Sequence, residues 1–299
     1  MIWDMLPPRV VLAAVDFSEP SRVALVYAAR LAKQCGAELH VLHAMDPLLT
    51  AAAREAGVDL AGETRDELTS FMQRATPAGD WAPIHHVVTG SAVDVICDIA
   101  ERERADAIVI GMRGMSGAER AMFGSTTEGV LRRADRSVLV VPATWTPPQP
   151  TSNDLRGTGP LVVGIELSTP ALAATRAACG LAAVFDTSVE AVHVVPLLPV
   201  PTRWSAHADA ALRRHADAAR TELAAALHDF SAECPVRLLV KPGRIAEELA
   251  AAVAPDAGRH PLLVLGRRTH GERGSAPGTI AYRVLTMAAV PVLMHLPEQ

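Results

Sequence analysis

Residues 10–18 read Val10-Val11-Leu12-Ala13-Ala14-Val15-Asp16-Phe17-Ser18, and residues 161–168 repeat the pattern as Leu161-Val162-Val163-Gly164-Ile165-Glu166-Leu167-Ser168. Each stretch is a short apolar run followed by an acidic residue and a serine, and 150 residues separate Asp16 from Glu166. Further pairs of similar segments follow in the same order, with offsets that stay between 150 and 155 residues. The chain therefore contains two copies of one structural unit.

Within each copy, short apolar runs alternate with longer amphipathic stretches, which is typical of a parallel sheet buried on both faces by helices. In the first copy we expect strands near residues 9–15, 38–45, 84–89, 106–110 and 137–141, with helices near 20–35, 51–75, 92–104 and 126–134. In the second copy we expect strands near residues 161–165, 188–195, 236–240, 261–265 and 290–295, with helices between them. Each copy is predicted to be a five-stranded α/β unit with right-handed crossovers.

The 299 residues are enough for two ordinary domains, which we place at residues 1–145 and 160–299. Residues 146–159 are rich in proline, glycine and polar residues and are interpreted as a linker. Hydrophobic residues make up 49% of the chain and aromatic residues only 4%, so two aliphatic cores are expected.

The composition also argues against several classes of protein. A net charge of −5 lacks the basic excess of a general nucleic-acid binder. The four cysteines are far apart in the sequence, which fits reduced thiols in a cytoplasm. The eleven histidines are dispersed, and no metal site is predicted. Neither a secretory signal nor a transmembrane run is visible, so we expect a cytoplasmic protein without a membrane partner.

A glycine loop follows the apolar run of residues 107–110 in the first copy. It reads Gly111-Met112-Arg113-Gly114, then nine residues, then Gly124-Ser125-Thr126-Thr127. Glycine allows backbone N–H groups to approach an anion, and a following helix offers unpaired donors and a partial positive charge. The loop therefore predicts a phosphate cradle, and a nucleotide is the leading ligand.

The spacing of this loop excludes two familiar catalytic frameworks. No lysine lies in the loop, whereas a Walker-type loop needs one to reach the outer phosphates. The dinucleotide fingerprint Gly-x-Gly-x-x-Gly is also absent, and the loop follows a late strand of its unit. Since no general base can be identified, we expect a binding protein with at most weak ATP hydrolysis rather than an enzyme.

Together these segments resemble the universal stress protein family, in its ATP-binding, tandem-domain form. The resemblance rests on the Gly-x2-Gly-x9-Gly-Ser/Thr loop and on three strand ends, which read Val15-Asp16-Phe17-Ser18, Leu42-His43-Ala44 and Val138-Leu139-Val140-Val141-Pro142. It implies two Rossmann-like or flavodoxin-like units, each with strand order 3-2-1-4-5 and helices on both faces. It also implies an adenine-nucleotide pocket and frequent homodimerisation through the last strand.

The resemblance implies roles for residues on the base and ribose side of the pocket. Val15 and Asp16 would border the base and ribose, and the Asp16 carboxylate would accept a hydrogen bond from a ribose hydroxyl. Ala44 would face the adenine. Asp16 could equally cap the helix that is expected to begin near Pro20, and the two roles are compatible.

The phosphate side of the pocket is assigned in the same way. Gly111 and Gly114 would let the loop wrap the ribose and phosphates, with Met112 and Arg113 in the same loop. Arg113 or Arg120 could neutralise the outer phosphates, although the family pattern fixes no arginine there, and Mg²⁺ can accompany ATP. The residues expected to bind phosphate through N–H and hydroxyl groups are Gly124, Ser125 and Thr126.

The second copy departs from this pattern. Thr269 stands where the second glycine of the loop should be, and the span to the final glycine is one residue shorter. Glu166 replaces Asp16, and Pro277 removes one possible N–H donor. We therefore predict weak or no nucleotide binding by the second copy. The rival hypothesis is that charge compensates for the lost backbone contacts, through Arg267, Arg268 and Arg273.

Three functions remain open at this point. The first is a stress-response sensor in which ATP occupancy shifts conformation or assembly. The second is an enzyme, either a slow ATPase or a nucleotide transferase, although residues 16–20 lack the glycine-rich loop that we would expect of the transferase. The third is a protein that binds cyclic AMP, since the base and ribose contacts would be shared.

Overall fold

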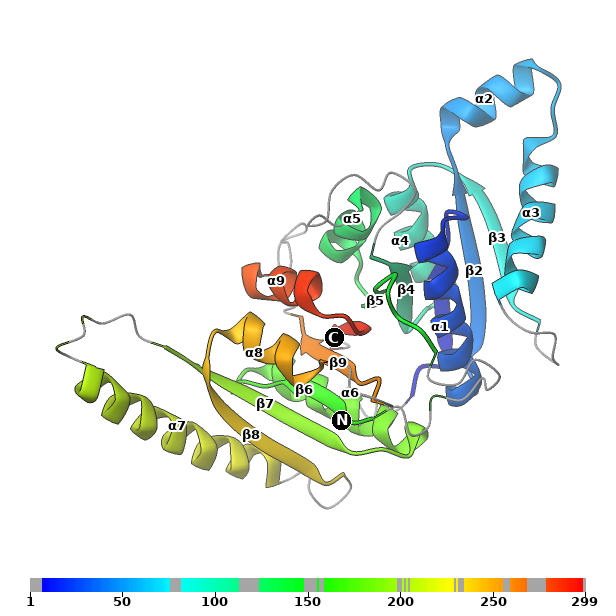
Figure 1. Cartoon of the computed structure of the whole chain (residues 1–299). Coiled ribbons are helices and arrows are strands. Elements are labelled where there is room, and N and C mark those ends of the chain that lie inside the picture. Colours follow the sequence, from blue (N-terminus) through cyan, green and yellow to red (C-terminus); the bar gives the residue numbers. More distant parts are fainter. Residues whose placement is uncertain are drawn as a thin grey trace. The chain divides into compact units, whose positions relative to one another are not determined.

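The computed structural model of the chain describes residues 7–75, 82–112, 124–147, 155, 159–197, 201, 203, 205–228, 230, 234–254, 259–267 and 278–297. The chain folds into two compact units (Figure 1), residues 8–155 and residues 156–269 with 277–299. We call them the N-terminal and the C-terminal unit. Most of the expected linker, residues 146–159, lies outside the described residues.

The N-terminal unit is built on five parallel strands in the order β3-β2-β1-β4-β5. Val11 in the central strand pairs with Leu39 on one side and with Ala107 on the other. The predicted strand order 3-2-1-4-5 is therefore confirmed. The strands are β1 (Val10–Ala14), β2 (Glu38–Met45), β3 (Ile84–Thr89), β4 (Ala107–Gly111) and β5 (Ser137–Val141).

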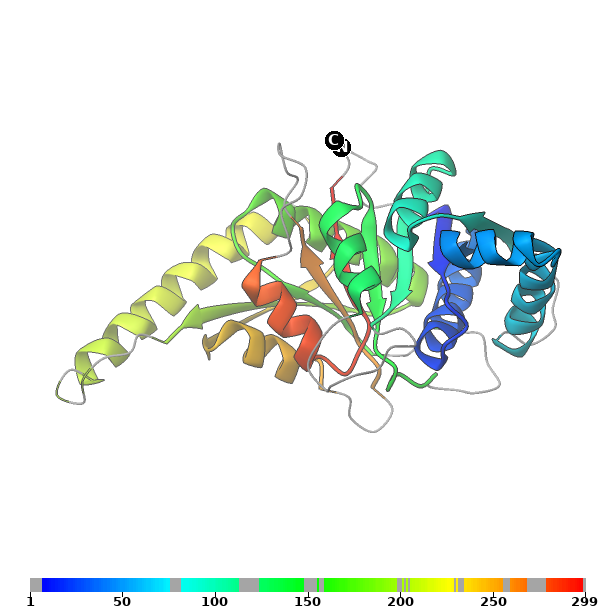
Figure 2. The ribbon, with the colours of Figure 1, turned by 90° about the horizontal axis from the view of Figure 1, so that it is seen from above.

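Helices cover both faces of this sheet. The first and third helices pack together on one face and the fourth and fifth on the other (Figure 2). The side chains of β4 and β5 are buried along their whole length, as the continuous apolar runs predict. The helices are α1 (Glu19–Cys35), α2 (Pro47–Glu55), α3 (Leu60–Ala75), α4 (Ala92–Arg102) and α5 (Ser125–Arg133).

The single helix expected over residues 51–75 is wrong, because the structure has two helices there, α2 and α3. The first begins earlier than expected, since Asp46 caps it by accepting from the N–H groups of Leu48 and Leu49. It ends at Glu55 with Ala56 as the C-cap residue, and Gly57 then takes a left-handed φ of 70°. The break thus comes from local capping, which overrides the apolar periodicity across it.

The C-terminal unit repeats the arrangement, with parallel strands in the order β8-β7-β6-β9-β10. Its strands are β6 (Leu161–Gly164), β7 (Val189–Pro196), β8 (Val236–Gly243), β9 (Leu262–Gly266) and β10 (Val292–His295). Its helices are α6 (Thr169–Phe185), α7 (Ser205–His228), α8 (Ile245–Ala252) and α9 (Thr279–Met287). Among the described residues, no helix is long and apolar enough to cross a membrane.

The entry to the first helix of each unit is built in the same way. Ser18 caps α1 and Ser168 caps α6, and each side chain accepts from the N–H three residues on. A proline follows in the first turn of both helices, where its missing N–H has no partner to lose. In each unit this turn follows the first strand, β1 or β6, and lies at the carboxyl edge of the sheet. Ligands of such folds bind at that edge.

Candidate functional site

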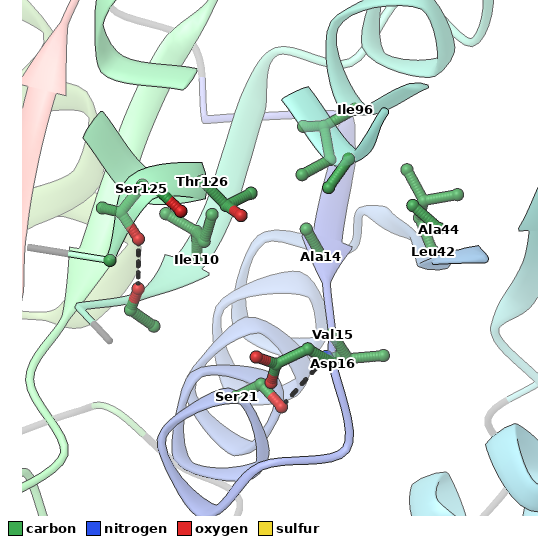
Figure 3. Close-up of a pocket in the computed structure, with 14 residues that line it drawn as sticks. Ala14, Val15, Asp16, Ser21, Leu42, Ala44, Ile96, Ile110, Ser125 and Thr126 are labelled. Atoms are coloured by element: carbon green, nitrogen blue, oxygen red, sulfur yellow. Dashed lines mark hydrogen bonds between the residues drawn. The ribbon is translucent and has the colours of Figure 1, made fainter. Parts of the chain in front are cut away.

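A cavity of about 250 Å³ lies at the carboxyl edge of the N-terminal sheet (Figure 3). It is bounded by the ends of β1, β2 and β4 and by the beginnings of α1, α4 and α5. The fourteen described residues that line it are Ala14, Val15, Asp16, Ser21, Leu42, Ala44, Ala92, Ile96, Ile110, Gly111, Gly124, Ser125, Thr126 and Thr127.

The two sides of this cavity differ in chemistry. Leu42 and Ala44 lie on one side of the view in Figure 3, and Ser125 and Thr126 lie on the opposite side. Ile96 of α4 completes the apolar side and is 3% exposed. The cavity therefore offers an apolar slot for a flat ring at one end and hydroxyl groups at the other.

The hydroxyl side is the N-terminus of α5. Gly124 is the N-cap residue and offers no capping side chain. The first intrahelical hydrogen bond runs from the N–H of Glu128 to the carbonyl of Gly124, at 3.0 Å. The N–H groups of the first turn have no intrahelical partner, and with the helix dipole they favour an anion there. The hydroxyl of Thr127, which is buried, donates to the Gly111 carbonyl at 2.8 Å. Thr127 therefore ties the end of β4 to α5.

Asp16 lies between the two sides, in the turn that follows β1. Its Oδ1 accepts from the hydroxyl of Ser18 at 2.5 Å and from the Ser18 N–H at 3.1 Å. Its own N–H donates to the Ser21 hydroxyl at 3.3 Å. The expectation that Asp16 caps the following helix is wrong, because Ser18 is the cap and Asp16 holds that serine in place. The carboxylate is thus anchored at the edge of the cavity.

An aromatic stack supports the same turn from behind. Phe17 has a φ of 63°, a backbone conformation that a bulky residue rarely adopts. Its ring stacks on His43 at 4.3 Å and meets the edge of Phe71 at 5.5 Å. Nδ1 of His43 donates to the Val15 carbonyl at 2.9 Å, and His193 donates to the Ile165 carbonyl at 2.8 Å in the C-terminal unit. Each histidine therefore holds the backbone just beyond the first strand of its unit.

Packing within the unit adds its own requirement for glycine at position 111. A Cβ at this position would lie 2.9 Å from the carbonyl oxygen of Pro20 and 3.0 Å from its carbon. A Cβ at Gly266 in the C-terminal unit would likewise clash with the backbone of Pro170, and more severely. In both units this glycine lets the end of a strand pass against the first turn of a helix.

The structure places seven of the predicted site residues on one cavity. Met112 is not among the lining residues, but its N–H donates to the Val141 carbonyl and its carbonyl accepts from the Gly124 N–H. Arg113 and Gly114 lie outside the described residues, as does Arg120. The seven that line the cavity are Val15, Asp16, Ala44, Gly111, Gly124, Ser125 and Thr126.

Seven further lining residues are absent from the prediction. Ala92 and Ile96 lie one turn apart on α4, and the strong amphipathicity of that helix could have indicated which face meets the sheet. Ser21 is hidden in the first turn of α1, where its hydroxyl also donates to the Ser18 carbonyl. The other residues that were missed are Ala14, Leu42, Ile110 and Thr127.

Larger apolar side chains stand at the equivalent positions of the C-terminal unit. The strand register equates Leu42 with Val192, so Val194 replaces Ala44 and is 6% exposed. Ile245 begins α8 where Ala92 begins α4.

Two leucines also close over the central strand of the C-terminal unit. A Cβ at Gly164, the counterpart of Ala14, would lie 2.7 Å from Leu265 and 3.3 Å from Leu249. The strand register equates Leu265 with Ile110, so both units carry a branched aliphatic side chain at this position. The loop differences at Thr269 and Pro277 lie outside the described residues.

Comparisons with known proteins agree with this architecture. The sequence profile described as "Universal stress protein family" matches residues 8–142 and 158–295. Universal stress protein MJ0531 of Methanocaldococcus jannaschii is 28% identical over 138 residues, which cover 44% of this chain and 81% of that protein. The crystal structure of a universal stress protein from Archaeoglobus fulgidus has a TM-score of 0.66 at 18% identity, covering 96% of this chain and 98% of that one. A second crystal structure, of PA1789 from Pseudomonas aeruginosa, has a TM-score of 0.59 at 18% identity, covering 98% and 94%.

Proposed function

This chain belongs to the universal stress protein family, and on that premise we propose that it binds an adenine nucleotide, ATP, in the N-terminal unit. The observation that carries the proposal is the order of surfaces along one cavity. An apolar slot beside Ala44, an anchored carboxylate at Asp16 and a helix N-terminus at Ser125 follow one another. A nucleotide presents a flat base, a ribose and phosphates in the same order.

The base would lie in the apolar slot. Ala44 and Ala92 are small and leave room for a ring between β2 and α4, while Leu42 and Ile96 form its walls. Burial of a heteroaromatic face against aliphatic side chains is favourable because it removes apolar surface from water. The cavity of about 250 Å³ is smaller than the roughly 300–1,000 Å³ of typical ligand sites. It would therefore enclose mainly the nucleoside, with the phosphates at the N-terminus of α5.

The ribose and phosphates would meet polar groups that the fold already orients. Asp16 is held by Ser18 with its carboxylate at the cavity edge, where it can accept from a ribose hydroxyl. Ser125 and Thr126 would add hydroxyl donors to the N–H groups at the start of α5. Mg²⁺ that accompanies ATP would be held mainly by the phosphates and water.

We propose that the chain acts as a stress-response sensor rather than as an enzyme. Asp16 is the only charged side chain among the described lining residues, and Ser18 already occupies one of its oxygens. Nothing else in that lining could serve as a general base for an attacking water. Occupancy of the site would then shift conformation or assembly. A slow ATPase remains the alternative, and steady phosphate release above that of a Ser125→Ala, Thr126→Ala variant would favour it.

The ligand is tested by titration calorimetry on the full-length chain. We expect ATP to bind with a stoichiometry near one, and Ser125→Ala with Thr126→Ala to weaken ATP about ten-fold or more, because hydrogen bonds to charged groups are lost. The matched control is Thr279→Ala, which alters the equivalent helix start of the C-terminal unit and should leave ATP binding unchanged.

The same titration with cyclic AMP distinguishes the two adenine nucleotides. If cyclic AMP bound more tightly than ATP, cyclic AMP would be the ligand of this site in place of ATP. Unchanged ATP affinity in the Ser125, Thr126 variant would overturn the phosphate assignment. Two equivalent ATP sites per chain would overturn the proposal that only the N-terminal unit binds.

Homodimerisation, through the last strand of a unit, is a further proposal that the resemblance suggests. Light scattering on the full-length chain, with and without ATP, measures its mass in solution. A mass of one chain at every concentration would contradict a dimer.

A further inference from the structure

Two histidines of the N-terminal sheet are linked to the end of α4. Nδ1 of His40, on β2, lies 2.9 Å from Nε2 of His86, on β3. Nδ1 of His86 in turn lies 3.5 Å from the guanidinium of Arg102, the last residue of α4. His40 is buried, with 4% of its surface exposed. One chain of polar contacts therefore joins β2, β3 and α4.

The arginine determines which ring nitrogens carry protons. Because a guanidinium only donates hydrogen bonds, Nδ1 of His86 accepts, and the ring proton of His86 is on Nε2. That Nε2 donates to Nδ1 of His40, which leaves the His40 proton on its own Nε2. The Nε2 of His40 is buried, has no hydrogen-bond partner in the described part of the chain and lies 3.7 Å from the Glu38 carboxylate. Both rings are therefore neutral, and both of their accepting nitrogens are occupied.

A further proton on either ring breaks one link of this chain. Protonation of Nδ1 of His86 removes the acceptor that faces Arg102 and places two positive charges about 3.5 Å apart. Protonation of Nδ1 of His40 instead sets two N–H donors against each other at 2.9 Å. In both cases the contact between the sheet and the end of α4 is weakened.

Four titratable or charged groups surround the pair, and they come from the elements packed around it. Burial, followed by the charge of His40, lowers the pKa of His86 below its usual value of about 6.5, with Arg102 and His85 acting in the same direction and Glu103 opposing them. On the other side of β2, His40 pairs with the apolar Leu12 of β1. The four groups are Glu38 of β2, His85 of β3, Arg102 of α4 and Glu103, which follows α4. The pair therefore takes up a proton only in acid.

The same strand and the same helix build the nucleotide cavity. His40 lies two residues before Leu42 and four before Ala44, so the three side chains share one face of β2. Leu42 and Ala44 line the cavity. Ile96 of α4 also lines it, and that helix ends at Arg102 beside the pair. A shift of α4 caused by the pair therefore moves a wall of the cavity.

The C-terminal unit has no such pair at the equivalent positions. The strand register equates His40 with Glu190 and His86 with Leu239. Glu190 forms an ion pair with Arg237 at 3.2 Å. An ion pair and an aliphatic side chain thus replace the two imidazoles. Within the two described sheets, the imidazole pair belongs to the unit that has the cavity.

We propose that the His40–His86 pair is a proton-binding site that regulates the nucleotide site, so that a proton taken up by the pair in acid releases the end of α4 and weakens ATP binding. This inference rests on the proposed binding of ATP in the N-terminal unit. The element that both sites bias is α4. Coupling between two sites is reciprocal, so bound ATP makes protonation of the pair less favourable.

The test compares ATP affinities of the full-length chain at pH 8.0 and pH 5.0 by titration calorimetry, with folding checked by circular dichroism. We expect affinity to fall about five-fold more in the wild type than in His86→Gln, which keeps a donor and an acceptor but does not titrate. A phosphate group also titrates near about pH 6, but this affects both proteins equally. The matched control is His85→Gln, an exposed neighbour on β3, which should keep the wild-type pH dependence.

The reciprocal effect is measured by NMR of the histidine rings. We expect saturating ATP to lower the pKa of His86 by about 0.7 pH unit, which is the same five-fold factor on a logarithmic scale. Arg102→Gln removes the guanidinium that connects the pair to α4. It should abolish the effect of ATP on the pKa while His86 still titrates, whereas a merely structural role of Arg102 would leave the effect in place.

The outcomes separate this inference from the proposed function. Equal pH dependence of ATP affinity in the wild type and in His86→Gln would overturn the coupling and leave ATP binding intact. A pKa of His86 that ATP does not change would do the same. If ATP bound at neither pH, the proposed function itself would fail, and the coupling would fail with it.

Discussion

Nδ1 of His40 lies 2.9 Å from Nε2 of His86, and the two imidazole rings stack across β2 and β3 at 5.2 Å. His40 is 4% exposed, whereas His86 is half-buried. A hydrogen bond between two imidazoles needs one nitrogen to donate and the other to accept. At least one of the two rings must therefore be neutral for this hydrogen bond to form, because a protonated imidazole has no nitrogen that can accept.

This pair predicts loss of stability in mild acid. Burial, followed by the charge of His40, lowers the pKa of His86, with Arg102 and His85 acting in the same direction and Glu103 opposing them. A folded pKa below the unfolded value of about 6.5 means that the unfolded chain binds more protons. Stability is therefore complete above pH 6.5 and falls as the pH drops from there toward the folded pKa.

Urea unfolding at pH 7.5 and pH 5.5 measures this loss. His86→Gln keeps a hydrogen-bonding side chain without a titrating group and should reduce the acid-induced change in unfolding free energy. His207→Gln, an exposed histidine of α7, serves as the control and should leave the change intact. Equal acid sensitivity in the wild type and in His86→Gln would show that other groups account for it.

The helix caps of the two units allow a matched comparison. Ser18→Ala and Ser168→Ala each remove one cap, and we expect each to lower the free energy of unfolding by about 1 kcal/mol. Only Ser18→Ala should also weaken ATP binding, because Asp16 loses the hydroxyl that holds its carboxylate at 2.5 Å. Calorimetric titration of both variants with ATP checks this difference, and an equal effect on affinity would argue against a ligand contact at Asp16.

Close backbone packing at the end of β4 predicts a purely steric effect. Gly111→Ala places a methyl 2.9 Å from the Pro20 carbonyl oxygen, so we expect a loss of about 1–3 kcal/mol in unfolding free energy. Gly278→Ala is the control, because a Cβ there meets nothing within 4 Å and only the N-cap preference is lost. If urea unfolding gave the same loss for both variants, the close approach would not be the cause.

The small residues of the apolar slot can be exchanged for those of the C-terminal unit. Ala44→Val with Ala92→Ile copies Val194 and Ile245, and should reduce ATP affinity more than ten-fold by filling the slot. The reverse substitutions, Val194→Ala with Ile245→Ala, should leave the stoichiometry at one. If titration calorimetry showed unchanged ATP affinity in the Ala44→Val, Ala92→Ile variant, the base would not lie in this slot.

Much of the fold could be read from short-range patterns. The apolar runs at residues 107–110 and 137–141 predicted buried strands, and the repeated segment at residues 161–168 predicted the second unit. The break at Gly57 was missed, because apolar periodicity continues through it while capping by Asp46 and the left-handed glycine decide the local structure.

The sequence by itself determined the two α/β units, because hydrophobic periodicity is a local property of the chain, while the strand order and seven residues of one cavity followed from the resemblance that its motifs carry. Only the tertiary structure revealed that Ile96 and Ala92 line that cavity, that Gly111 is required by Pro20, and that larger residues stand at the equivalent positions of the C-terminal unit. These relationships join residues that are distant in sequence, and packing between separate elements, rather than any local preference, decides them.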